Sequence, residues 1–158
     1  METTNEYTIT GKTMMLAPAL RMEGGTVVYE EEKTFFVTQT PTEIIHENCF
    51  RGFATFDGRV KAVRKYFHFE KKVPVLVYEK NRIACFPTHS SKNHLCHWVF
   101  PAHIRVMEKD PFTTGFTLIH TRNNKTLRLP ISPYVAGKQL GRTDHLLRML
   151  FLTPPDNI

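Results

Sequence analysis

The segment from Cys85 to Trp98 concentrates side chains that often carry chemistry: two cysteines, three histidines and two serines. Structural zinc sites need four convergent ligands, usually cysteine or histidine pairs two to four residues apart. No C-x-x-C pair occurs, and Cys96 is adjacent to His97. We therefore expect buried thiols and surface imidazoles, with no metal and no cofactor. The less favoured alternative is a zinc site made of Cys85, His89, Cys96 and His97.

Nucleophilic and phosphate-binding motifs are also absent. A serine becomes a nucleophile beside a positioned base, yet no G-x-S-x-G elbow surrounds Ser90 or Ser91. Gly24 and Gly25 match neither glycine-rich phosphate motif. The run 30–32 of three glutamates is typical of a solvated edge rather than an acid–base pair. We therefore predict that the protein is not an enzyme.

Basic side chains are the strongest functional feature. Residues 51–105 hold eleven Lys/Arg and three Asp/Glu, a net charge of +8, whereas residues 1–50 carry −5 and residues 106–158 carry +3. Charge of one sign gathered on a domain attracts a polyanion, which favours nucleic acid as the partner. The candidate contacts in and beside two expected helices are Arg51, Arg59, Lys61, Arg64, Lys65, Lys138 and Arg142.

A polar loop supplies the second group of candidates. After Pro87, the run from His89 to His94 exposes hydroxyl, amide, ammonium and imidazole groups, which bond phosphate oxygens and minor-groove acceptors. Its candidate contacts are Ser90, Ser91, Lys92 and Asn93. Trp98 could wedge into nucleic acid, but its place in an alternating strand pattern favours a core position.

Short strands make up most of the remaining pattern. Residues Tyr7–Thr10, Thr26–Glu30 and Thr34–Gln39 are rich in Thr, Val, Tyr and Phe, which is typical of strands. Five further strands are expected at 73–78, 82–86, 99–107, 116–121 and 126–129. Turns at 79–81 and 123–124 join neighbours, so we expect a mixed, mainly antiparallel sheet.

Three helices are expected. Pro41 begins the first, over 42–49, and a short amphipathic helix over Arg59–Phe67 places its basic side chains opposite its apolar ones. Ser132 is an N-cap for a longer helix running to about Phe151. We find no helix-turn-helix pattern.

Length and composition fit one globular domain. The 158 residues, 41% hydrophobic and 23% charged, can bury a sizeable core. We expect a single domain over 1–158, with an acidic β-rich part (1–40), a basic central part (41–105) and a C-terminal hairpin and helix (106–152). Three cysteines, no leader and no apolar run of about 20 residues predict a cytoplasmic protein without membrane spans.

The order of several motifs resembles one known family. They are ENCFRGF at Glu47–Phe53, DGRVKA at Asp57–Ala62, FPTHSS at Phe86–Ser91 followed by CHW at Cys96–Trp98, LPIS at Leu129–Ser132, and GRT at Gly141–Thr143. Over about residues 43–150 the chain is similar to the ComK family of competence transcription factors. The acidic N-terminal part matches only loosely.

The resemblance implies an activator of competence genes, needed for DNA uptake, that binds AT-rich promoter boxes mainly through the minor groove. It also implies self-association as dimers paired into a tetramer, contact with RNA polymerase, and an adaptor for a Clp-type protease. Arg and Lys suit the negative potential of a narrow AT-rich groove. Because family members can extend further beyond the last helix, we expect tail-dependent control to differ here.

We therefore predict an α+β fold, a single domain with a mainly antiparallel sheet of short strands, a short basic helix and a longer C-terminal helix. The predicted function is transcription activation through double-stranded AT-rich DNA. The alternative is a non-enzymatic interaction module whose basic face meets an acidic protein; salt dependence and AT preference of duplex binding would separate the two.

Overall fold

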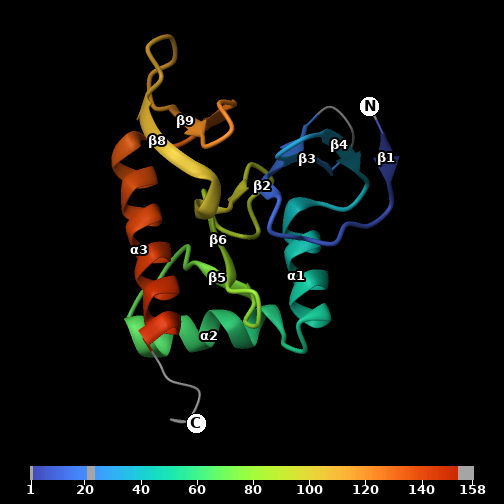
Figure 1. Ribbon diagram of the computed structural model, residues 1–158, viewed down its shortest axis with the longest axis vertical. Coiled ribbons are helices and arrows are strands. Elements are labelled where there is room, and N and C mark those ends of the chain that lie inside the picture. Colours follow the sequence, from blue (N-terminus) through green and yellow to red (C-terminus); the bar gives the residue numbers. More distant parts are fainter. Residues whose placement is uncertain (1, 21–23, 153–158) are drawn as a thin grey trace.

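The computed structural model describes residues 2–20 and 24–152, whose strands form two sheets (Figure 1). The larger sheet has the order β1 (Thr3–Thr4), β4 (Thr34–Val37), β3 (Gly25–Glu30), β2 (Thr13–Ala19), β7 (Trp98–Val99), β6 (Ile83–Pro87), β5 (Val75–Tyr78). The smaller has the order β10 (Thr126–Leu129), β9 (Thr117–Thr121), β8 (Ile104–Lys109). Among these strands β1 and β4 pair in parallel and the other pairs are antiparallel, which confirms the α+β prediction.

The helices are α1 (Pro41–Arg51), α2 (Phe56–Phe67) and α3 (Pro133–Leu152), close to the expected positions. Thr40 and Glu43 form a reciprocal capping box at the start of α1. The start of α2 lies three residues earlier than expected because the Thr55 hydroxyl accepts from the Gly58 amide at 2.9 Å. In the described chain, none of these helices has the length and apolarity required to span a bilayer.

Two main cores lie on opposite faces of the larger sheet. Cys85 of β6 packs in the first core with Ile44 and Ile45 of α1, whereas the next residue, Phe86, packs in the second with Ala136 of α3. This change of face follows from the alternation of side chains along a strand. A third cluster joins α2, β5, β6 and the last turns of α3.

The expected strand at Tyr7–Thr10 is wrong. Tyr7 and Ile9 are buried with exposed neighbours, so their pattern imitates a strand. Their backbone groups pair with one side chain instead, because the Ile9 amide donates to Asn48 Oδ1 at 2.8 Å and Asn48 Nδ2 donates to the Tyr7 carbonyl at 2.9 Å. The first long strand is β2, which the sequence pattern did not reveal.

The expected strand over residues 99–107 is also wrong. It is split into β7, a 3-10 turn at Pro101–His103, and β8, and the two strands belong to different sheets. Pro101 has no amide hydrogen to donate and ends the pairing. The break redirects the chain from the larger sheet into the smaller one.

Candidate nucleic-acid interface

The loop between β6 and β7, residues 88–97, is fixed by its own polar side chains. The Thr88 hydroxyl accepts from the His97 amide at 2.9 Å, and the Thr88 amide donates to the His97 carbonyl at 3.0 Å. The Thr42 hydroxyl, in the first turn of α1, donates to the Ser91 carbonyl at 2.8 Å and accepts from Trp98 Nε1 at 3.2 Å. The loop is therefore anchored to the adjacent helix.

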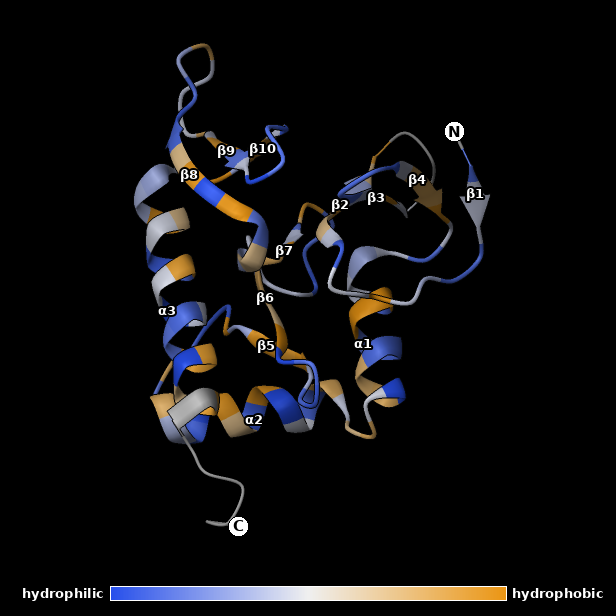
Figure 2. Cartoon of the chain, viewed as in Figure 1, coloured by the Kyte–Doolittle hydropathy of each residue, from blue (hydrophilic) through white to orange (hydrophobic). Residues whose placement is uncertain are grey.

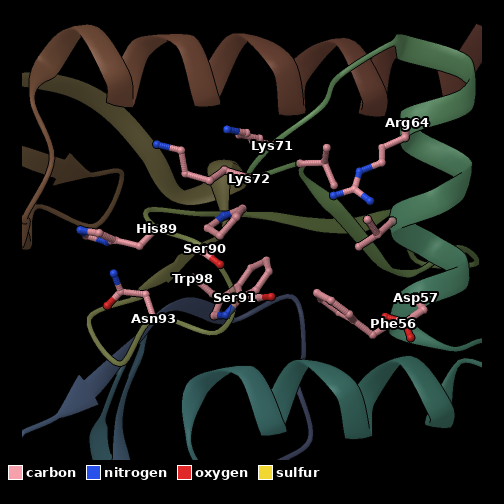
Figure 3. Close-up of a pocket in the computed structure, with 13 residues that line it drawn as sticks. Phe56, Asp57, Arg64, Lys71, Lys72, His89, Ser90, Ser91, Asn93 and Trp98 are labelled. Carbon is pink, nitrogen blue, oxygen red and sulfur yellow. The ribbon is translucent and has the colours of Figure 1, made fainter.

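A cleft of about 520 Å³ separates this loop from α2. Its floor is apolar and includes Phe56 and Trp98, while its rim is polar and basic. Figure 3 shows the Arg64 guanidinium directed from α2 into the cleft, opposite the polar loop. The rim residues are Asp57, Arg64, Lys71, Lys72, His89, Ser90, Ser91 and Asn93.

A second cleft of about 540 Å³ shares Lys71 and Lys72 with the first and extends along the first half of α3. Its other polar residues include Lys138 and Arg142. We call the two the paired clefts. The segment Lys71–Lys72 lies where they meet, so cations from α2, from this segment and from α3 border one continuous surface.

The backbone of this segment is clamped by α3. Gln139 is 2% exposed, and its amide nitrogen donates to the Lys72 carbonyl and to the Pro87 carbonyl, each at 2.8 Å. Arg142 donates to the Lys71 carbonyl at 3.1 Å and to Gln139 Oε1 at 2.8 Å. Gln139 thus ties the Lys71–Lys72 segment to the strand end from which the polar loop begins.

Two residues of the connection between α2 and β5 have a left-handed backbone. His68 has φ 58° and ends α2, and Lys72 has φ 50°. For residues other than glycine this region is costly and persists where surrounding contacts enforce it. At Lys72 the Gln139 hydrogen bond is such a contact.

The structure brings six of the predicted residues to the paired clefts. Arg64, Ser90, Ser91 and Asn93 border the first, and Lys138 and Arg142 border the second. Lys92 lies on the other side of the polar loop, beside a smaller cavity next to the end of β2. Lys61 and Lys65 are exposed on α2 but line neither cleft.

Arg51 and Arg59 are engaged elsewhere. Arg51 donates to the Thr8 hydroxyl at 2.7 Å and pairs with Glu6 at 3.5 Å. The Arg59 side chain is only 16% exposed and lies 3.8 Å from Glu79. Their surroundings therefore favour a structural role for both, although a DNA contact by either stays a prediction.

Helices α1 and α2 are joined by only four residues, Gly52 to Thr55, and α2 runs across the end of α1 in Figure 1. A short turn containing glycine between two helices also occurs in helix-turn-helix units. The sequence showed no helix-turn-helix pattern, and that reading stays a prediction. The outer side of α2 presents Lys61, Lys65 and Tyr66.

Lys71 and Lys72 belong to the basic region that the sequence indicated, and His89 belongs to the polar run, but none of the three was among the predicted contacts. The adjacent lysines were visible in the sequence, but their place between two clefts depends on Gln139, 67 residues after Lys72. Burial and then the nearby Lys72 ammonium lower the pKa of His89. In the free protein this favours the neutral form of the His89 ring at the cleft rim.

The cysteines belong to the core. Cys49, Cys85 and Cys96 are all unbridged and buried in the first core, and burial raises the pKa of each thiol, to about 11 for Cys49 and Cys96. Metal ligation needs accessible thiolates. In the part of the chain that the structure describes, no cluster of three or more Cys, His, Asp or Glu side chains is arranged to hold a metal ion. The zinc alternative therefore gains no support.

Comparison with known proteins places the chain in a family. The model of the family described as ComK protein matches residues 4–151, and the chain belongs to this family. A relative, the competence transcription factor of Bacillus subtilis (strain 168), is 27% identical over 139 residues, which cover 87% of this chain and 71% of the relative. No solved structure matches the chain.

Proposed function

We propose that the protein is a transcription factor that binds double-stranded promoter DNA and activates competence genes. Family membership and the printed function of the Bacillus subtilis relative support the biological role. The observation that carries DNA binding is the convergence of Arg64, Lys71 and Lys72 with a rigid polar loop around one cleft. Arginine, lysine, serine and asparagine together are typical donors to phosphate oxygens.

In the proposed mechanism the paired clefts bind the phosphate backbone and position the protein on the duplex. The base sequence is recognised separately, through contacts in a groove of the DNA. Cations of the clefts neutralise phosphates and release counterions. Recognition of AT-rich boxes through the minor groove is proposed from the family resemblance, and arginine is suited to that groove because AT tracts narrow it and deepen its negative potential. Self-association, contact with RNA polymerase, adaptor-mediated proteolysis and a place on the nucleoid remain proposals on the same ground.

The short connection between α1 and α2 favours a second way of recognising the base sequence, through the major groove. In a helix-turn-helix unit the second helix enters the major groove, which here would place Lys61, Lys65 and Tyr66 at base edges. This mode does not change the proposed function, but it changes which edge of the bases is read.

A mobility-shift titration with chemically altered duplexes tests the function and separates the two modes. We expect tighter binding to an AT-rich than to a GC-rich duplex of equal length, and loss of binding when a minor-groove-filling polyamide is added. Replacing adenine by 7-deazaadenine removes a major-groove acceptor and should leave affinity unchanged. Equal affinity for both duplexes, with no dependence on salt, would favour the acidic-protein partner instead.

A further inference from the structure

The connection between β8 and β9, residues 110–116, projects beyond the smaller sheet at the end of the molecule opposite α2 (Figure 1). It carries Pro111 and Phe112, and the Phe112 side chain is 94% exposed. Figure 2 shows an apolar stretch at this projecting end, above hydrophilic strand residues. A single exposed aromatic ring is common on protein surfaces, so the contacts and charges around Phe112 must show what it does.

The loop that presents Phe112 is held by a network of polar contacts. The Asp110 carboxylate accepts from the Phe112 amide at 2.9 Å and pairs with Arg128 of β10 at 3.0 Å. Arg128 also donates to the Thr113 hydroxyl at 3.0 Å, and its guanidinium lies 4.7 Å from the centre of the Phe116 ring. The amide of Phe112 and the Arg128 side chain hold the pKa of Asp110 below its usual value, so the network stays charged.

The chemistry around the loop favours a polyanion. Between Ile104 and Leu129 there are five Lys/Arg and two Asp/Glu. Both carboxylates are already paired, Asp110 with Arg128 and Glu108 with His120 at 3.1 Å. The cations at Arg105 and Lys109 are exposed on β8.

A single aromatic ring on a narrow loop suits DNA better than a protein partner. A specific protein interface buries about 800 Å² on each side around a cluster of anchors. One Phe or Pro is instead the form of wedge that minor-groove proteins insert between base pairs to kink the duplex. Trp98, the other aromatic residue that the sequence offered as a wedge, is 1% exposed and cannot insert into DNA.

We propose that Phe112, supported by Pro111, inserts between two base pairs from the minor groove and kinks the bound duplex. The inference rests on the proposed function, DNA binding, and adds a second contact with the duplex beside that of the paired clefts. Helix α3 joins the two ends of the molecule, packing on α2 through Leu146 and on the smaller sheet side through Ala136. The second cleft lies along the first half of this helix, the half that packs towards the smaller sheet, so the paired clefts and the sheet that carries the loop lie next to one another.

The test measures DNA bending by energy transfer between dyes at the two ends of an AT-rich duplex. Wild-type protein should shorten the end-to-end distance. Phe112→Ala should abolish most of that change and weaken binding roughly tenfold, the scale of one lost stacking contact, while the salt slope stays unchanged. Phe112→Leu should retain most of the bend, since leucine is also a wedge residue. Phe50→Ala, on α1, removes another exposed phenylalanine and should behave as wild type.

The outcomes separate the inference from the function on which it rests. If wild-type protein binds the duplex without bending it, or if Phe112→Ala bends it fully, the wedge is overturned and DNA binding stands. If Phe112→Ala binds and bends normally but fails to activate transcription, the loop contacts protein and the wedge is again overturned. If wild-type protein binds no duplex, both the proposed function and the inference fail.

Discussion

At the scale of single residues, cations of the same type have different roles because their neighbours differ. Arg51 is bonded to Glu6 and Thr8, whereas Arg64, among the described residues, donates to one backbone carbonyl, that of Glu70 at 3.1 Å, and borders the cleft. A phosphate would have to replace the existing partners of Arg51, whereas at Arg64 it would displace no acidic side chain. Charge counts along the sequence could therefore locate the basic region but not the contacts within it.

His89 should make DNA binding depend on pH. Its pKa is lowered in the free protein by burial and by Lys72. A phosphate at the cleft rim would raise that pKa, so the complex binds a proton that the free protein lacks, and affinity should rise as pH falls from about 8 to about 6. Titrations at several pH values check this, and His89→Gln should remove this part of the pH dependence.

Folding stability changes in the opposite direction and serves as the control. Because the folded state lowers the pKa of His89, the folded state binds fewer protons, and this stabilisation is present at high pH and lost as pH falls. Tighter DNA binding at low pH therefore cannot result from the contribution of His89 to folding stability, which falls in that direction. An affinity that is independent of pH in the wild-type protein would remove His89 from the interface.

At the scale of elements, the sequence predicted features that depend on neighbouring residues and missed those that depend on contacts between distant parts of the chain. Pro41 and Ser132 mark the starts of α1 and α3 correctly, since the Ser132 hydroxyl accepts from the Val135 amide at 3.3 Å. The core position of Trp98 is confirmed as well. The segment at Tyr7–Thr10 failed because its backbone pairs with Asn48, about 40 residues away, which no local pattern reveals.

The candidate site follows the same division. The residue types of the polar loop and of α2 indicated both rims of the first cleft, but nothing in their spacing showed that Lys71 and Lys72 lie between two clefts. That position is set by Gln139, a buried polar residue in the middle of an amphipathic helix. The sequence signal for such a junction is a glutamine in the middle of an amphipathic helix, because a polar side chain that becomes buried there needs hydrogen-bond partners.

Replacing Gln139 by leucine should loosen this junction. The variant leaves the carbonyls of Lys72 and Pro87 without their partner, at a cost of about 1–3 kcal/mol in the free energy of unfolding. Denaturant unfolding measures the loss. Duplex affinity, measured where the variant is still folded, should fall too, because Lys72 is no longer held between the clefts.

Gln139→Glu supplies the matched comparison. An ionised carboxylate cannot donate to either carbonyl, whereas a protonated one can donate to one of them. This variant should therefore be less stable than Gln139→Leu at neutral pH and should recover part of its stability at acid pH. A Gln139→Leu protein as stable as wild type would show that the clamp has no energetic role.

At the scale of the whole molecule, the sheets, helices and cores of the described chain hold polar and basic groups from distant parts of the sequence on one surface. The first core fixes α1 beneath the polar loop, and the third fixes α2 against β5 and α3. The segment Lys71–Lys72 connects these parts. The fold thus accounts for a surface that neither the charge pattern nor any single element defines.

The measurement that tests the account most directly is the salt dependence of duplex binding. For wild-type protein the logarithm of affinity should fall steeply with the logarithm of salt concentration, by about 0.9 per phosphate contact. The pair Arg64→Ala and Lys72→Ala should reduce that slope by about 1.8. The pair Lys12→Ala and Lys80→Ala removes the same charge from exposed sites outside the paired clefts and should leave the slope unchanged. Equal slopes for the two double variants would contradict the assignment of DNA binding to the paired clefts.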